Sequence, residues 1–221
     1  MTKPICVDLF CGLGGWAQGF LAEGYDVVGF DIERHDYGTG GYPGQLVLQD
    51  VLTLHGAQFK DAACIVASPP CQAYSYRAMP WKRAKALPPP DNTLFEACFR
   101  IQREACESAG RYIPMVVENV QGAQKWVGRA AWKYGSFCLW GDVPALMPIR
   151  QLSEGLKLPG TAQPRLFSGR RLALRGQTTT AAAFYSVNSQ STARKAASAA
   201  IAKIPFPLSR HIARTYKAVA P

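Results

Sequence analysis

The stretch ICVDLFCGLGGWAQGFLAEGY, residues 5–25, decides the fold. Its first six residues are mostly apolar and predict a buried strand, and the spacing of the later large apolar residues predicts a helix. A turn with Gly12, Gly14 and Gly15 joins the two. Glycines at such a turn let the backbone approach a ligand closely and leave helix N–H groups free. A nucleotide-like cofactor site is one interpretation, but the spacing is not G-x-G-x-x-G and does not identify the site alone.

Apolar runs and helical patterns alternate over the next hundred residues. The sequence predicts further strands at residues 26–33, 45–51, 62–70 and 113–120, and a helix at residues 92–110. This alternation predicts an α/β fold with a mostly parallel sheet and helices on both faces. In such sheets, ligands bind beyond the carboxyl ends of the strands.

Acidic residues stand at two of these strand ends. Asp31 closes the second strand and could hold the hydroxyl groups of a ribose, with Glu33 as a near competitor. Asp50 closes the third and could accept a hydrogen bond from an adenine amino group. Each acid alone is equally typical of a solvated strand end or a helix cap. Together with the glycine turn, they indicate an adenosine-containing cofactor.

Cys71 follows a Pro-Pro step in IVASPPCQAYS, residues 65–75. The two prolines stiffen the chain and disfavour helix just before the thiol. The segment after it is long, aromatic and basic, and its positive field favours the nucleophilic thiolate. The basic side chains there include Arg77, Lys82, Arg83 and Lys85. The alternative is an inert buried cysteine.

Glu118 lies directly after an apolar strand in VVENV, residues 116–120. A partly desolvated carboxyl group tends to stay protonated near neutral pH and can act as a general acid. Asn119 could orient it. The alternative is a strand-end glutamate in water.

Composition narrows the class of protein. The 221 residues suit one large domain or one domain with a small appendage. The formal net charge of +10 favours a polyanionic partner such as nucleic acid, although many soluble proteins are simply basic. Seven cysteines without a C-x-x-C pair argue against a disulfide framework or a cysteine-rich zinc site. Without a long apolar run or a secretion signal, we expect a cytoplasmic protein and no membrane partner.

Five motifs, in this order, resemble those of the cytosine-5 DNA methyltransferases. They are DLFCGLGGWAQGF (8–20), GFDIE (29–33), QDV (49–51), SPPCQAYS (68–75) and VENV (117–120). The resemblance covers roughly residues 5–125 and implies the Rossmann-like class I fold of methyltransferases that use S-adenosylmethionine. It further implies methylation at C5 of a cytosine that is flipped out of double-stranded DNA, without a metal.

The resemblance also implies roles for individual residues. The cofactor would meet Asp8, Phe10, Cys11, Gly12, Gly14, Gly15, Asp31, Ile32, Asp50, Val51 and Pro70. Catalysis would use Cys71 as the nucleophile on C6 of cytosine, Glu118 at N3, and Asn119. DNA would meet Gln72, Ser75, Arg77, Lys82, Arg83, Lys85 and Arg194, and Tyr74, Tyr76 or Trp81 would fill or flank the space of the flipped base.

The chain departs from the family pattern in three places. The Gln-Arg-x-Arg-like motif has no convincing counterpart; Arg165, Arg170, Arg171 and Arg194 are candidates. The asparagine usually found before the final Pro-x-Pro-Leu helix start is absent. A reduced target-recognition region is left between residues 141 and 190, after a catalytic domain at 1–140 and before a returning segment at 191–221.

Such compact forms resemble enzymes encoded by bacteriophages and prophages, and we expect a monomer of a bacterial or phage-infected cell, with a role such as restriction-modification. Three alternatives remain open at this point: an RNA or other pyrimidine acceptor, a variant sulfonium donor, and a DNA-binding relative with weak catalysis.

Overall fold

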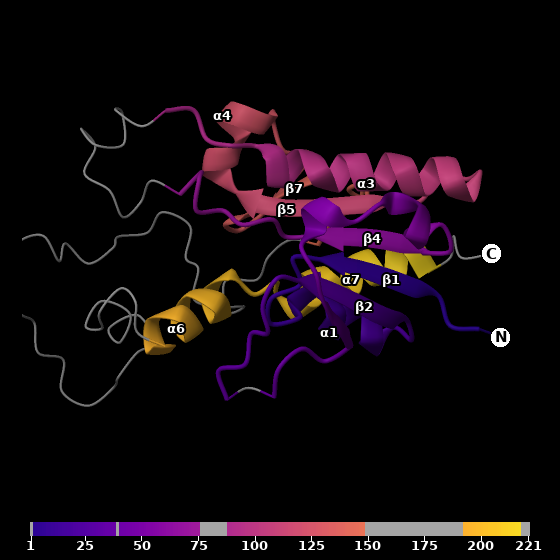
Figure 1. The fold of residues 1–221 in the computed structure, drawn as a ribbon, viewed down its shortest axis with the longest axis horizontal. Helices are drawn as coiled ribbons and strands as arrows, with labels where there is room; N and C mark the ends of the chain where they lie inside the picture. Colours follow the sequence, from indigo (N-terminus) through magenta and orange to yellow (C-terminus); the bar gives the residue numbers. More distant parts are fainter. Residues whose placement is uncertain (1, 39, 76–87, 149–191, 218–221) are drawn as a thin grey trace, which may run out of the picture.

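A seven-stranded mixed sheet forms the centre of the protein (Figure 1). The computed structural model describes residues 2–38, 40–75, 88–148 and 192–217. The strands are β1 (Ile5–Leu9), β2 (Asp26–Asp31), β3 (Gln45–Leu48), β4 (Cys64–Ala67), β5 (Met115–Val120), β6 (Trp132–Tyr134) and β7 (Phe137–Gly141). Their order is β3-β2-β1-β4-β5-β7-β6, with β1 to β5 parallel and β6 and β7 antiparallel. The predicted α/β fold with a mostly parallel sheet is confirmed.

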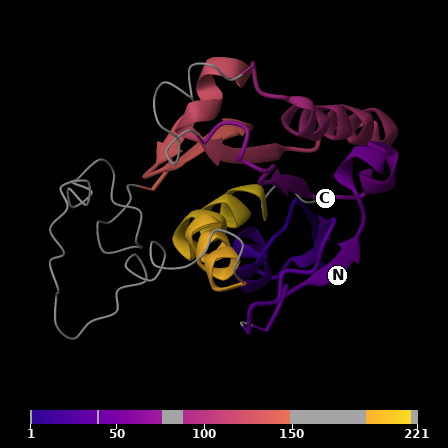
Figure 2. The same ribbon diagram turned by 60° about the vertical axis from the view of Figure 1, so that its left-hand side comes forward.

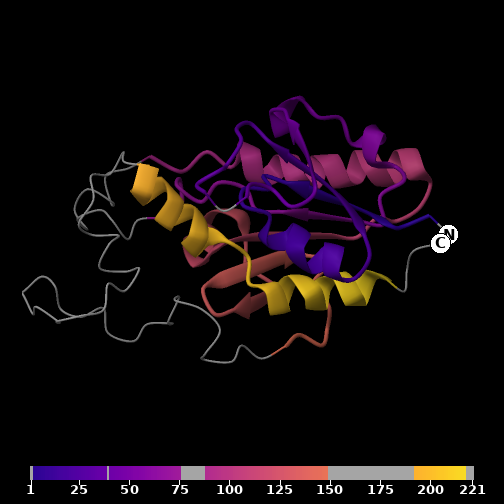
Figure 3. The same ribbon diagram turned by 90° about the horizontal axis from the view of Figure 1, so that it is seen from below.

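Helices cover both faces of the sheet (Figure 3). α1 (Gly15–Ala22) and α7 (Phe206–Lys217) lie on one face, and α3 (Thr93–Ala109) lies on the other. The other helical elements are α4 (Gln124–Val127), α6 (Thr192–Ala202) and the 3-10 turns η1 (Val51–Thr53), η2 (Gly56–Phe59) and η3 (Gln121–Ala123). Within the described part of the chain, no helix has the length and apolar character needed to cross a membrane.

The central strands supply two hydrophobic cores because neighbouring residues of a strand point to opposite faces. Val7 and Leu9 of β1 pack into the core beneath α3, together with Ile65 of β4. Cys6 and Val66 point the other way, into the core beneath α1 and α7. Both faces of these strands are therefore buried, which explains their continuous apolar sequence.

The C-terminal helix α7 packs closely against α1. A Cβ atom on Gly19 would collide with Ser209 and the backbone of Arg210, so the two helices approach where a side chain is missing. The Ser209 hydroxyl donates to the carbonyl oxygen of Trp16, and Tyr25 Oη donates to the carbonyl oxygen of Ala213 at 3.0 Å. These bonds join the two ends of the chain.

The hairpin of β6 and β7 was not predicted. Its strands have three and five residues, which is too short for a clear pattern in the sequence. β7 is added to the sheet through antiparallel pairing with β5, from Val116 opposite Gly141 to Val120 opposite Phe137. The position of β7 in the sheet therefore follows from its pairing with β5, which comes earlier in the chain.

Candidate active site

A cavity of about 750 Å³ lies at the carboxyl ends of the central strands. Its volume falls within the range of roughly 300–1,000 Å³ that small-molecule sites occupy. Of the residues predicted for the site, Phe10, Cys11, Gly12, Gly15, Asp31, Ile32, Asp50, Pro70, Cys71, Gln72 and Glu118 line it. Cys71 and Glu118, which are far apart in sequence, thus meet at one cavity. Asp8, Gly14, Val51, Ser75 and Asn119 are not among its lining residues.

The glycine turn after β1 is held against the end of β2. Cys11 N–H donates to the carbonyl oxygen of Phe30 at 3.1 Å, and Gly12 N–H donates to Oδ2 of Asp31 at 3.0 Å. Phe10 has a φ of 57°, which is uncommon for a residue with a side chain and costs free energy. Backbone strain of this kind clusters at functional sites, and here it bends the turn around the cavity.

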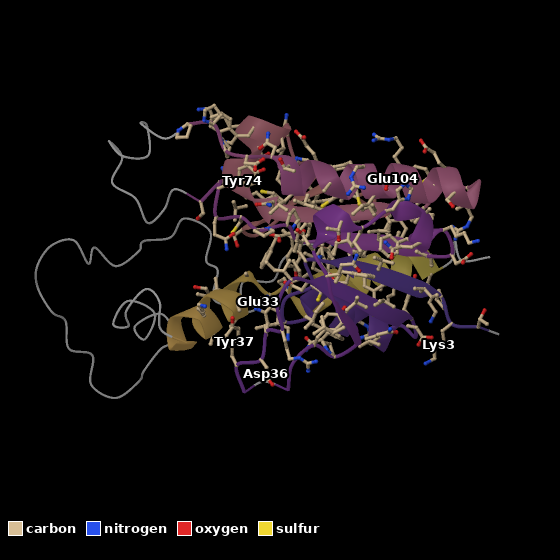
Figure 4. The ribbon with its side chains drawn as sticks, in the orientation of Figure 1. Lys3, Glu33, Asp36, Tyr37, Tyr74 and Glu104 are labelled. Atoms are coloured by element: carbon tan, nitrogen blue, oxygen red, sulfur yellow. The ribbon has the colours of Figure 1, made fainter. Side chains whose placement is uncertain are left out.

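Asp31 is a largely buried carboxylate with fixed partners. Besides the bond from Gly12, its Oδ1 accepts from the Glu33 N–H at 3.4 Å and lies 3.5 Å from Nε2 of His35. His35 Nδ1 lies 3.3 Å from Oη of Tyr37. Glu33, His35 and Tyr37 all line the cavity, and Figure 4 shows Glu33 and Tyr37 at the end of the sheet opposite Lys3. His35 and Tyr37 were not predicted because their segment has no periodic pattern.

Asp50 has two tasks at the end of β3. Its Oδ1 accepts from the Leu52 N–H at 2.9 Å, which caps η1. The residue is exposed and also lines the cavity. The helix-cap interpretation is thus confirmed without removing Asp50 from the site. Its neighbour Val51 is buried in the core beneath α3.

The Pro-Pro step before Cys71 is anchored from β5. Asn119 is 1% exposed, and its Nδ2 donates to the carbonyl oxygen of Pro69 at 3.0 Å. Its Oδ1 accepts from the Val120 N–H at 2.8 Å. Asn119 therefore connects the strand that carries Glu118 to the turn that carries Cys71, a link that sequence reasoning did not foresee.

Tyr74 closes the segment after Cys71 and is 3% exposed. Its Oη donates to Oδ1 of Asn92 at 2.9 Å, and burial raises its pKa. A Cβ atom on Gly122 would collide with the Tyr74 carbonyl oxygen, so this backbone is closely packed. The ring of Tyr74 is thus packed in the interior in this structure, and it is out of reach of a flipped base if that packing persists on DNA. The other two aromatic residues expected to fill or flank the space of the base, Tyr76 and Trp81, lie outside the described residues.

Asp8 supports the glycine turn from inside the protein. It is fully buried, and Tyr42 Oη donates to its Oδ2 at 3.0 Å. Burial raises the pKa of Asp8 well above its ordinary value, although the hydrogen bond from Tyr42 opposes this rise. Gly14, with a left-handed φ of 70°, is covered by Tyr42 and Pro43. Neither Asp8 nor Gly14 has direct access to the cavity.

The segment from α6 to α7 forms one wall of the cavity, and sequence reasoning did not assign it there. The lining residues of this wall are Lys195, Ser198, Ala199, Ala202, Lys203 and Ile204. Figure 2 shows α6 (orange) leading directly into α7 (yellow), and α7 lies beside α1. The Pro-x-Pro-Leu start of α7 was the signal in the sequence, but it gave no position relative to the glycine turn.

The predicted DNA contacts are described only in part. Gln72 and Ser75 are exposed, and Arg194 belongs to α6, but its side chain is outside the described part. The other expected contacts and the other arginine candidates lie outside the described residues. They are Tyr76, Arg77, Trp81, Lys82, Arg83, Lys85, Arg165, Arg170 and Arg171. In the ranges that are described, no three His, Cys, Asp or Glu side chains gather as a metal would require.

A family model matches more than half of the chain, and several solved structures are similar to part of it. A family model for C-5 cytosine-specific DNA methylases matches residues 5–127. A candidate DNA modification methyltransferase of an E. coli prophage shares 27% identity over 57% of this chain and 35% of its own, with a TM-score of 0.40. The Dnmt2 methyltransferase of S. pombe shares 17% identity over 57% of this chain and 37% of its own, with a TM-score of 0.39. The Entamoeba histolytica methyltransferase EhMeth shares 15% identity over 58% of this chain and 41% of its own, also with a TM-score of 0.39. The chain thus spans 35–41% of these three structures. No curated protein matches it.

Proposed function

Because the chain belongs to the C-5 cytosine-specific DNA methylase family, we propose that it methylates C5 of a cytosine flipped out of double-stranded DNA, with S-adenosylmethionine as the donor. The sheet and its covering helices have the class I methyltransferase fold, so the cavity stands where such folds bind ligands. The observation that carries the proposal is the convergence of Cys71, Glu118 and Asp31 on this one cavity.

The residues of the cavity fit S-adenosylmethionine. Asp31, held by Gly12, would accept hydrogen bonds from the ribose hydroxyls, and the exposed side of Asp50 would meet the adenine amino group. The apolar side chains of Phe10 and Ile32 would flank the adenosine. Cys11, Gly15 and Pro70 would shape the pocket, whereas Val51 would support it from the core. Bound there, the cofactor supplies an electrophilic methyl group on a positively charged sulfur.

Cys71 and Glu118 would make cytosine reactive. C5 of the free base is too weak a nucleophile to accept a methyl group. The thiolate of Cys71 would add to C6 while Glu118 donates a proton or hydrogen bond to N3, which turns C5 into an enamine-like nucleophile. After methyl transfer, loss of the C5 proton and departure of the Cys71 thiolate would restore the ring. The base must leave the DNA stack to reach these groups.

Asn119 would act as a positioning residue for this reaction. Its bond to the Pro69 carbonyl oxygen fixes the turn on which Cys71 stands, relative to the strand that carries Glu118. A misplacement of about 1 Å between reacting groups can cost roughly a hundredfold in rate. We therefore assign Asn119 to the geometry of the site rather than to the chemistry.

The DNA itself would meet the exposed residues beside Cys71. Gln72 lines the cavity rim, and Ser75 lies three residues further on. The basic residues Arg77, Lys82, Arg83, Lys85 and Arg194 would neutralise phosphates, in line with the net charge of +10. Residues 141–190 would serve as a reduced target-recognition region between the catalytic domain (1–140) and the returning segment (191–221).

Covalent trapping on DNA tests the proposal. In duplex DNA that contains 5-fluorocytosine, fluorine replaces the hydrogen at C5 and cannot leave as a proton does. In the presence of S-adenosylmethionine, an adduct between Cys71 and C6 should therefore accumulate. It should survive denaturing electrophoresis. Cys71→Ser should give no adduct, because a hydroxyl group is a far weaker nucleophile than a thiolate. Cys106→Ser is the matched control, since Cys106 is a half-buried thiol on α3 outside the cavity.

The alternatives predict other outcomes. If the adduct forms with RNA containing 5-fluorocytosine and not with DNA, the methyl acceptor is RNA. DNA binding without an adduct or methyl transfer would indicate a non-catalytic relative. An adduct that persists in Cys71→Ser would overturn the assignment of the nucleophile.

A further inference from the structure

Lys203 stands beside the glycine turn because of how the C-terminal segment packs. Ile204 is 4% exposed, and a Cβ atom on Gly15 would collide with its backbone nitrogen. The two backbones are therefore in direct contact at the first residue of α1. Lys203 precedes Ile204 and lines the cavity with it and with Gly15. A cation is thereby placed where the chain leaves the glycine turn.

The ammonium group of Lys203 has no counter-ion among the described residues. The side chain is half-buried, and desolvation lowers its pKa. Two carboxylates of the cavity wall have partners of their own, since Asp31 accepts from Gly12 and Asp50 accepts from Leu52. None of the ion pairs between described side chains includes Lys203. A partly desolvated cation without an anion is costly, and a bound anion would offset that cost.

The start of α1 adds positive potential in the same corner of the cavity. Its N-cap residue, Gly14, has no side chain that could accept from the first N–H groups, and the first turn contains no acidic residue. The Ala17 N–H is bonded to the buried carboxyl group of Asp8. The partial positive charge of the helix N-terminus therefore reaches the cavity at Gly15 and Trp16, which line it. Lys203 and this partial charge would therefore favour the same anion, whereas Asp31 and Asp50 lie at the ends of β2 and β3.

Building on the proposed function, we propose that Lys203 binds the carboxylate of the methionine end of the sulfonium donor and makes this carboxylate a requirement for tight binding. S-adenosylmethionine carries a sulfonium, an ammonium and a carboxylate group, and only the carboxylate is attracted to a lysine. The adenosine end then meets Asp31 and Asp50.

Equilibrium binding without catalysis tests this inference. Isothermal titration calorimetry would compare S-adenosylmethionine with its decarboxylated form, which keeps the sulfonium and the ammonium but lacks the carboxylate. Lys203→Met should weaken binding of S-adenosylmethionine about 10- to 100-fold, as expected for loss of a charge-assisted hydrogen bond. Binding of the decarboxylated form should change far less. Lys217→Met, an exposed lysine of α7 outside the cavity, should leave both affinities unchanged.

The outcomes separate this inference from the proposed function. If the wild-type protein binds neither compound, the donor itself is wrong and the proposed function fails. If it binds S-adenosylmethionine but Lys203→Met keeps the same preference for the carboxylate, only the role of Lys203 is overturned. An equal loss of both affinities also overturns it, because that result indicates packing rather than recognition. Lys203→Gln, which keeps a polar end, provides the same comparison if Lys203→Met does not fold.

Discussion

At the scale of single residues, Asp8 and Asp31 show how two acids in consecutive strands acquire different tasks. Asp8 points into the interior, where burial raises its pKa and Tyr42 is its hydrogen-bond partner. Asp31 stands at the strand end, where Gly12 N–H holds one oxygen and the cavity receives the rest of the side chain. Their different depth in the sheet separates an acid of the interior from an acid that lines the cavity.

With the ribose bound as proposed, Asp31→Ala should weaken the binding of S-adenosylhomocysteine about 10- to 100-fold, because it removes the proposed acceptor and the bond that holds Gly12. Titration calorimetry would measure the affinity. The control is Asp26→Ala at the opposite end of β2, where Asp26 pairs with Lys3 at the surface. A similar loss in both variants would show that the strand, rather than the site, was disturbed.

At the scale of elements, α1 acts through the glycines on its buried face. Gly15 lets Ile204 approach, and Gly19 lets α7 approach at Ser209 and Arg210. The helix therefore binds both the end of the cavity wall and the last helix of the chain. Larger residues at these positions would push α1 away from Ile204 and from α7.

Gly15→Ala should lower the free energy of unfolding by about 1–3 kcal/mol, because the new Cβ atom meets the backbone of Ile204, which cannot move as a side chain can. Higher helix propensity would return at most about 1 kcal/mol. Denaturant titration would measure the change, and Gln18→Ala on the exposed side of α1 serves as control. A variant of Gly15 that is more stable than wild type would contradict the packing described for this contact.

At the scale of the whole molecule, the last helix completes a body that begins with the first strand. Glu23, at the end of α1, accepts from Arg210 Nε at 2.6 Å and from Arg214 Nε at 2.8 Å, both on α7. These bonds lower the pKa of Glu23, and the bond from Arg210 has the largest effect. A group whose pKa is lowered on folding stabilises the folded state above its unfolded pKa, and this stabilisation is lost as pH falls through the folded value.

Glu23→Gln should therefore reduce the free energy of unfolding at pH 7. The difference from wild type should shrink as the pH falls below about 4, because the carboxylate takes up a proton first in the unfolded state and then, at lower pH, in the folded state. Denaturant titrations at about pH 7 and pH 3 would measure it. Glu107→Gln, an exposed glutamate on α3, should show no such pH dependence. A difference that grows as the pH falls would contradict the role of the arginines.

Much of the candidate site was predictable because its signals are local. Gly12, Asp31, Cys71 and Glu118 each follow an apolar run, and the carboxyl ends of parallel strands share one edge of a sheet. Once the strands were parallel, these residues had to lie near one another. The roles of Asn119 and Tyr74 could not be predicted in this way, because their partners, Pro69 and Asn92, come from other elements.

The sequence by itself determined the parallel α/β sheet, the glycine turn and the chemistry-bearing strand ends, since periodicity and turn residues act over a few neighbours. Only the tertiary structure decided that Lys203 joins the site and that Asp8 and Tyr74 do not face it. Such contacts join residues far apart along the chain, as Tyr25 and Ala213 do across 188 positions. They depend on which helix faces pack together, and no local pattern carries that information.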